Sequence, residues 1–226
     1  MANTTGSANT AATTTARRPT AERRYLLIHG DESTAREVLT AHMAQDTGAG
    51  FGVAYLIDNP TRTIAFRGGK LDPNRMFSSL GAAANLRKLN PGWTTKQIDD
   101  GVKYLNTNRN QLVNRLIPPK GGLIIAVHNN SRGYDIQSEI PISDAHALND
   151  PSNPGDFGLL VNPDDYAAVK DGPYNMVLQA NPRGDDDGSL SRLAVKLGIR
   201  YINLEAKLGN IEKQRAMLAW IEQRLS

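Results

Sequence analysis

The sequence predicts an α/β protein with three layers, α/β/α, around a mixed, mostly parallel central sheet. Two observations support this fold class. Strand-like and helix-like patterns alternate along the chain from Tyr25 onward. In addition, residues 123–127 are apolar at every position, as expected of a central strand that is covered on both faces. The 226 residues are enough for one such domain with its own hydrophobic core.

Residues 1–22 differ in composition from the rest of the chain. They consist largely of Thr, Ala, Ser, Asn and Gly and cannot bury enough apolar surface to offset the entropy of ordering. We therefore predict a disordered leader or linker over residues 1–22 and a folded domain over residues 23–226. The leader lacks the apolar core of a signal peptide. Our interpretation is the start of a mature exported chain, periplasmic or secreted, and the alternative is a cytoplasmic protein with a disordered start.

The first half of the folded domain opens with a short apolar strand at residues 25–28, which breaks at Gly30. A helix follows from Ser33, where Thr34 and Glu37 have the spacing of a capping box. The next elements are strands at 52–58 and 63–66, a helix at 79–89, and a helix that starts with a second capping box at Thr94 and Gln97 and stops before Pro118.

The second half opens with the apolar strand at 123–127, which is predicted to end at His128. Further strands are expected at 136–142, 157–161, 175–180 and 200–204, the last of them ending at Glu205. Two helices complete the domain, one capped by Ser189 and ending near Gly198, the other an amphipathic helix over residues 211–225.

Composition excludes several classes of protein. The absence of cysteine rules out disulfides and thiolate-ligated metal ions. No apolar run reaches the length of a membrane-spanning helix. The net charge is only +3, and no basic stripe with interleaved aromatic residues predicts a nucleic-acid partner. The sequence does not indicate an oligomeric state.

The chain has four histidines, and two of them occupy similar positions. His29 and His128 each follow a strongly apolar strand, and Glu32 comes three residues after the first. Residues at the carboxyl ends of parallel strands lie where α/β proteins bind ligands. Two imidazoles and one carboxylate suit a catalytic zinc ion, which keeps its fourth position open. We therefore predict that His29, Glu32 and His128 bind one zinc ion.

The other two histidines are interpreted as structural. His42 lies within the first helix and is expected at or near its surface, and His146 lies in a polar loop where solvent exposure is expected.

Metal-assisted hydrolysis also needs a group that takes up a proton and passes it to the leaving group. Glu205 is placed for this role because it follows an apolar strand; the alternative is an exposed residue in a turn. A glycine-interrupted loop at residues 66–77 carries Arg67, Asn74 and Arg75. A guanidinium group suits carboxylates and can stabilise an oxyanion, whereas the alternative is a solvated basic loop.

Together these segments resemble the zinc carboxypeptidase and aspartoacylase/succinylglutamate desuccinylase superfamily. His29-Gly30-Asp31-Glu32 is similar to its His-Gly-x-Glu motif, and Asp72-Pro73-Asn74-Arg75-Met76-Phe77 resembles its Asp-x-Asn-Arg-x-Phe motif. His128-Asn129-Asn130 resembles its third-ligand segment, and Leu204-Glu205 resembles its late catalytic glutamate. The motifs keep the order of the family over residues 25–210. Pro73 stands where leucine is more usual.

The resemblance implies a zinc-dependent hydrolase that cleaves an amide bond next to a free carboxylate, in a peptide or an N-acyl amino acid. His29, Glu32 and His128 would bind the zinc ion. Glu205 would act as general base and then as general acid, and Arg67 would polarise the scissile carbonyl. The substrate carboxylate would be held by Asn74 and Arg75.

Two points stay open at this stage. The peptidase branch has a tyrosine that closes over the substrate, and Tyr134, Tyr166 and Tyr174 are all candidates. The alternative function is a binding module that keeps the fold and captures a carboxylate-bearing peptide or glycan fragment without cleaving it.

Overall fold

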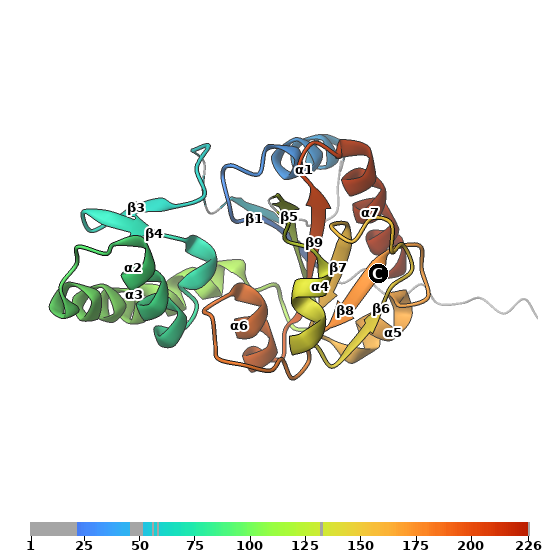
Figure 1. The fold of residues 1–226 in the computed structure, drawn as a ribbon. Helices are drawn as coiled ribbons and strands as arrows, with labels where there is room; N and C mark the ends of the chain where they lie inside the picture. Colours follow the sequence, from blue (N-terminus) through green and yellow to red (C-terminus); the bar gives the residue numbers. More distant parts are fainter. Residues whose placement is uncertain (1–21, 46–51, 56, 58, 132, 226) are drawn as a thin grey trace, which may run out of the picture.

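A seven-stranded mixed sheet forms the centre of the protein in the computed structural model, which describes residues 22–45, 52–55, 57, 59–131 and 133–225 (Figure 1). The strand order is β2-β1-β5-β9-β7-β8-β6. Four neighbouring pairs are parallel, and only the β7–β9 and β6–β8 pairs are antiparallel. The predicted mixed, mostly parallel sheet is therefore confirmed. The strands are β1 Arg23–Leu27, β2 Gly52–Tyr55, β5 Leu123–Asn130, β6 Ala145–Ala147, β7 Phe157–Leu160, β8 Asn175–Leu178 and β9 Arg200–Lys207.

Helices cover both faces of this sheet and make three layers (Figure 1). The first face carries α1 Ser33–Gln45, α5 Pro163–Val169 and α7 Ile211–Arg224. The second face carries α2 Ser79–Leu89, α3 Thr95–Leu116, α4 Ile136–Glu139 and α6 Leu190–Leu197. A separate two-stranded hairpin, β3 Ile64–Phe66 with β4 Gly69–Leu71, lies beside α2 and α3. Short 3-10 helices span Pro73–Arg75 and Ile140–Ile142.

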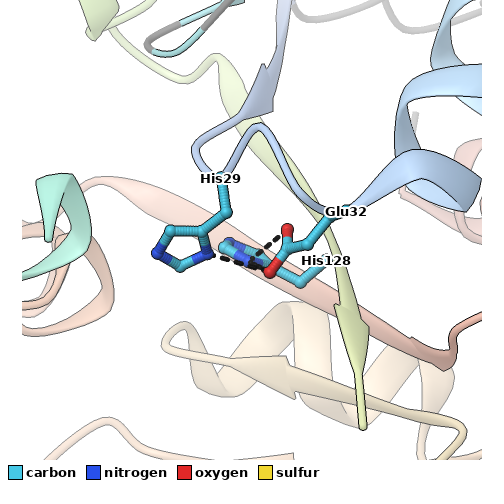
Figure 2. A group of neighbouring side chains, drawn as sticks. All are labelled: His29, Glu32 and His128. Carbon is cyan, nitrogen blue, oxygen red and sulfur yellow. Dashed lines mark hydrogen bonds and ion pairs between the residues drawn. The ribbon is translucent and has the colours of Figure 1, made fainter. Parts of the chain in front are cut away.

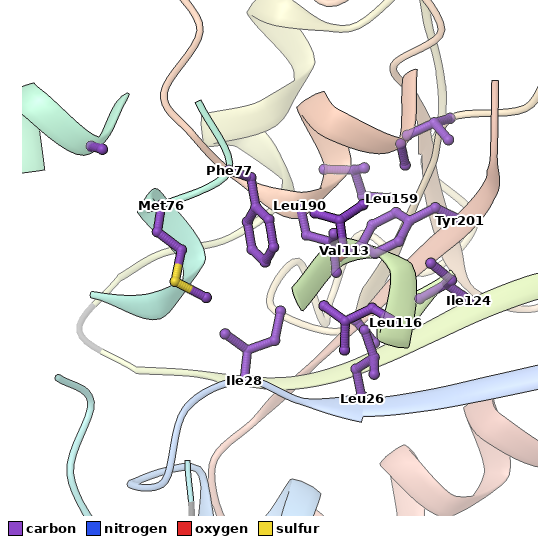
Figure 3. Packing of buried hydrophobic residues seen from close by; sticks show 14 of the residues in the cluster. Leu26, Ile28, Met76, Phe77, Val113, Leu116, Ile124, Leu159, Leu190 and Tyr201 are labelled. Atoms are coloured by element: carbon purple, nitrogen blue, oxygen red, sulfur yellow. The ribbon is translucent and has the colours of Figure 1, made fainter. Parts of the chain in front are cut away.

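The strands bury apolar side chains on both faces, which divides the core into two clusters. Successive side chains of a strand point to opposite faces. Leu26 and Ile124 therefore pack in the cluster under α2, α3 and α6, seen in Figure 3, whereas Leu27 and Ile125 pack under α1 and α7. All eight residues of β5 are buried, as the sequence predicted for a central strand.

Several local predictions are confirmed. The Thr94–Gln97 capping box is formed, and Ser189 caps α6, which ends at Gly198 in the left-handed conformation. The helix predicted at 79–89 and the strands predicted at 157–161 and 175–180 are present within one or two residues of their expected bounds. The strand predicted at 52–58 is present over Gly52–Tyr55.

Other local predictions are wrong. Residues 136–142 form α4 and a 3-10 helix instead of strands, because the side chain of Asp135 caps the helix by accepting from the N–H of Gln137. The helix α1 already begins at Ser33, so Thr34 lies inside it and cannot act as its cap. The Thr34 hydroxyl instead accepts a hydrogen bond of 2.8 Å from the N–H of Gly209.

The predicted leader, residues 1–22, lies almost wholly outside the described residues. Among the residues that the structure describes, no helix is long and apolar enough to cross a membrane.

Candidate metal centre

The three predicted ligands converge at one point on the α2–α3 face of the sheet (Figure 2). His29 and Glu32 occupy the turn between β1 and α1, and His128 lies on the neighbouring strand β5. One ligand atom from each residue lies within 4.8 Å of the others. All three residues are at least 96% buried, the most exposed being Glu32 at 4%. The site therefore depends on the parallel pairing of β1 with β5.

The contacts in this cluster fit a metal ion. The Glu32 carboxylate lies 2.8 Å from His29 Nδ1 and 3.1 Å from His128 Nδ1. The other nitrogen of His29, Nε2, lies 2.9 Å from the Asp72 carboxylate, an arrangement that fixes the ring orientation of a metal-binding histidine. His128 Nε2 is buried without a hydrogen-bond partner. His29, Glu32 and His128 could thus bind one ion with two nitrogens and one carboxylate.

Electrostatics hold Glu32 ionised and favour a proton on His29 when no metal ion is bound. Burial raises the pKa of Glu32, but the charges and hydrogen bonds of His128 and His29 outweigh it and lower the pKa to about 2. For His29, burial lowers the pKa, and hydrogen bonds from the ring to the Asp72 and Glu32 carboxylates outweigh burial and raise it to about 8.

The metal-free protein is expected to lose stability as the pH rises through the pKa of His29. The folded state holds this proton more tightly than the unfolded chain, so the contribution is complete below about pH 6.5. It amounts to about 2 kcal/mol and disappears as the pH rises to about 8. Chemical denaturation of chelator-treated protein at several pH values measures this contribution to the free energy of unfolding. Equal stability of the metal-free protein across this range would contradict the assignment.

Glu205 lies beside the ligand cluster on the next strand, β9. It is the register partner of His128, and it is 6% exposed. β9 continues to Lys207, so Glu205 lies within the strand and not at its end as predicted. Asn203 donates a hydrogen bond of 3.1 Å to Oε1 of Glu205, whereas Oε2 has no partner. Burial raises the pKa of the Glu205 carboxyl group.

A cavity of about 710 Å³ joins these residues. Its lining includes all three candidate ligands and Glu205, together with Asn74 and Arg75. Asn74 also links two segments, because its Oδ1 accepts from the N–H of Leu190 at the start of α6. Among the described residues, no acceptor engages its side-chain nitrogen, Nδ2, which can therefore donate to a ligand. Arg75 lies 3.6 Å from Asp187 and is half-buried at the cavity wall.

Arg67 does not line this cavity. It occupies the turn of the β3–β4 hairpin with a φ of 50°, followed by Gly68 with a φ of 82°. Its guanidinium group lies over the ring of Tyr104, 5.5 Å from the ring centre. The stretch around Arg67, which was expected to be a loop, is thus the turn of a hairpin that directs Arg67 away from the ligands.

Arg62, which the sequence analysis did not single out, lies at the cavity instead. Its guanidinium group is 3.3 Å from Asp72 and 3.7 Å from Glu32, and its side chain is 48% exposed. No local motif marks this residue. It reaches the site because the N–H of Gly30 donates to the carbonyl of Thr61, which holds the loop before β3 against the turn that carries His29.

Tyr134 is the one of the three candidate tyrosines that lines the cavity. Its hydroxyl donates to Glu139 at 2.7 Å, and burial raises its pKa. Tyr166 packs in the cluster under α1 and α7, on the opposite face of the sheet, and Tyr174 packs against Trp220. The remaining histidines agree with their structural interpretation, since His42 is half-buried on α1 and His146 is exposed on β6.

Replacing Gly30 by Ala is expected to destabilise the protein and to displace Arg62. A Cβ at this position would lie 1.6 Å from the carbonyl oxygen of Asn59, so the loop that carries Arg62 must move. We expect a loss of about 1–3 kcal/mol in the free energy of unfolding, as for other overpacked sites. Gly92→Ala is the matched control, because a Cβ there meets open space. Denaturation curves of both variants measure the change in stability. Equal stability of the two variants would refute the close approach of Gly30 to Asn59.

Comparison with known proteins identifies no family. No protein-family model matches the chain, and no curated protein matches it. Among solved structures, one match is a candidate metallopeptidase from Shewanella baltica OS155, with 14% sequence identity and a TM-score of 0.44. The alignment covers 90% of this chain and 76% of that one. Both scores are too low for this likeness to bear on the activity of the present protein.

Proposed function

We propose that the protein is a zinc-dependent hydrolase that cleaves an amide bond adjacent to a free carboxylate. The observation that carries the proposal is the placement of a buried carboxylate, Glu205, beside a buried His29-Glu32-His128 cluster in a cavity that also presents arginines. Two neutral nitrogens and one carboxylate favour zinc among the common ions, and the proposed site holds one ion.

Each residue has a role that follows from its surroundings. A bound zinc ion would supply Lewis-acid polarisation of the substrate carbonyl and a water nucleophile at neutral pH. Glu205 accepts a proton through its unpartnered Oε2 and returns it to the leaving amine. Its raised pKa suits both steps, because the acid and the base must both be accessible near neutral pH.

The arginine side chains around the cavity have two further roles. Arg62 takes the role that was expected of Arg67, since a guanidinium beside the ligands can stabilise the developing oxyanion. The substrate carboxylate is held by the guanidinium group of Arg75 and by the side-chain amide nitrogen of Asn74. Tyr134 closes the cavity wall near Glu205, whose charge contributes to the raised pKa of the tyrosine.

The alternative, a binding module without catalysis, is less well supported. Burying an ionised carboxylate with one unpartnered oxygen costs free energy. Binding alone gains nothing from such a group, whereas proton transfer requires it. Glu205 therefore favours the enzyme.

The proposal is tested with paired substrates. Zinc-loaded protein is incubated with short peptides that end in a free carboxylate, with the same peptides as C-terminal amides, and with N-acyl amino acids. We expect one zinc ion per chain and release of the terminal residue only where the carboxylate is free. Protein that retains no zinc and cleaves nothing after zinc is added would refute the proposal. Binding of the free acids without cleavage would establish the alternative.

A further inference from the structure

The cavity extends past Glu205 across β7 toward α4 and the end of β8. Glu205 is the register partner of Phe157, and Asn203 is the partner of Leu159, so their side chains share one face of the sheet. The ring of Tyr134 packs on Phe157 with the ring centres 5.9 Å apart. We call Tyr134, Glu139, Leu159 and Gln179, which line the cavity here, the α4 wall.

Glu139 gives the α4 wall a carboxylate with no cationic partner among the residues that the structure describes. Its Oε1 accepts from the Tyr134 hydroxyl and its Oε2 accepts from Gln179 Nε2, each at 2.7 Å. Among the described residues, no Lys, Arg or His nitrogen forms an ion pair with it. A carboxylate offers four lone-pair sites, so two remain open after these contacts. Neutral donors thus fix the orientation of Glu139 and leave its charge available.

Among the described residues, none of the arginines that line the same cavity forms an ion pair with Glu139. Arg192 donates to the carbonyls of Pro182 and Arg183, and Arg183 donates to the carbonyl of Pro141. Arg75 donates to the carbonyl of Asn74 and faces Asp187. The contacts of these arginines therefore leave Glu139 without an ion-pair partner among the described residues.

A second, buried acceptor points to the same ligand chemistry. Asn203 is 9% exposed, and its Oδ1 is buried without a hydrogen-bond partner while its amide nitrogen is engaged by Glu205. It lines the cavity beside Leu159. A buried acceptor without a partner costs free energy unless a ligand supplies a donor.

The proposed reaction fixes which part of a substrate meets this wall. Glu205 returns its proton to the leaving amine, so the residue that bears this amine must lie beside Glu205. His128 on β5, with His29 and Glu32 in the turn after β1, lies on one side of Glu205, and the α4 wall occupies the other side. The side chain of the leaving residue is therefore directed over β7.

We propose that the α4 wall is a subsite for a positively charged side chain, an amino or guanidinium group, on the substrate residue that carries the free carboxylate. Glu139 pairs with the charge, and Asn203 Oδ1 accepts a hydrogen bond from the same side chain or from the amine next to it. This inference rests on the proposed function for the orientation of the substrate.

Two readouts on zinc-loaded protein test the subsite. Calorimetric titration compares the binding of L-lysine with that of L-norleucine, which has a similar length and no charge. Steady-state assays compare N-benzoylglycyl peptides that end in lysine, norleucine or glutamate. We expect lysine to be favoured over norleucine about 10-fold or more in both Kd and kcat/KM. Glutamate should be the poorest of the three, because it meets a like charge.

Glu139→Gln keeps the size of the side chain but removes the charge. Its amide oxygen can still accept from Gln179, and its amide nitrogen can donate to the Tyr134 oxygen in place of the bond that Tyr134 donates to Glu139. It should reduce the lysine-to-norleucine ratio to about 3-fold or less. Glu212→Gln is the matched control, because Glu212 is exposed on α7 and pairs only with Arg215 there. The ratio should not change in this control. The comparison in the unmodified protein needs no variant, so misfolding of Glu139→Gln would leave the test intact.

The outcomes separate the subsite from the proposed function. Hydrolysis without a preference for lysine overturns the subsite and leaves the hydrolase standing. Preferential binding of lysine that depends on Glu139, without any hydrolysis, supports the subsite and refutes the hydrolase. Equal binding of lysine and norleucine, or no binding of either, overturns the subsite.

Discussion

Glu205→Gln is expected to lower kcat by about 10²–10⁴-fold while leaving zinc binding unchanged, because general acid–base groups contribute on this scale. The amide cannot accept or return a proton. Its oxygen can still accept from Asn203, so the local packing should persist. Glu205 contacts none of the ligands by a hydrogen bond, and the affinity for zinc should therefore be retained.

The same substitution should raise the stability of the protein at neutral pH. The pKa of Glu205 is raised by burial, so its ionised form is less favourable in the folded state than in the unfolded chain. The penalty grows as the pH rises from the unfolded pKa to the folded pKa and is complete above it, and a neutral amide removes it. Lower activity together with a higher Tm at pH 7 would indicate that Glu205 serves catalysis and reduces the stability of the protein. Glu205→Gln with wild-type turnover would exclude Glu205 as the proton acceptor.

The sequence was sufficient for the parts of the site that depend on strands. A continuous apolar run predicts a buried strand, whereas the predicted ends were wrong, because β5 continues past His128 to Asn130 and β9 continues past Glu205 to Lys207. His29, His128 and Glu205 all belong to such runs, and neighbouring parallel strands place them together. The predicted convergence of the ligands therefore follows from one topological rule.

The sequence was insufficient where position depends on pairing between loops. Arg62 and Arg67 flank the short strand predicted at 63–66, and nothing local distinguishes them as site residues. The difference arises because Arg67 falls on a hairpin turn, whereas the loop of Arg62 is bonded to Gly30. Similarly, the three isoleucines of residues 136–142 suggest strands, but only Ile136 is buried. Their helical conformation directs Glu139 into the cavity, which strand periodicity did not predict.

The hydrogen bonds of the metal centre also explain the length of its turn. Two residues separate His29 from Glu32, and α1 starts immediately afterwards with the N–H of Arg36 bonded to the carbonyl of Glu32. Glu32 therefore occupies the cap position of α1, where a negative charge is stabilised by the helix dipole. The same residue that begins the helix thus presents its side chain to His29 and His128.

His29→Ala is expected to weaken the affinity for zinc by about 100-fold and to reduce any hydrolysis that depends on the ion. Four ligands of a structural zinc site contribute about 10–16 kcal/mol, so one ligand is worth roughly 3 kcal/mol, or about 100-fold in affinity. His146→Ala is the matched control, because His146 is exposed on β6 and should not affect binding. Competition with a chromophoric chelator measures both variants. Unchanged affinity in His29→Ala would refute the site.

Asp72→Asn distinguishes a ligand from a group that orients one. Asp72 contacts His29 Nε2 at 2.9 Å and Arg62 at 3.3 Å but is not one of the three clustered ligands. Its substitution should weaken the affinity for zinc by about 10–100-fold and still allow one ion per chain at saturation. It should also lower the pKa of His29, because the Asp72 carboxylate helps to raise it. The pH-dependent stability loss of the metal-free protein should then be smaller and should be complete at a lower pH. An unshifted loss would mean that Asp72 does not control the protonation of His29.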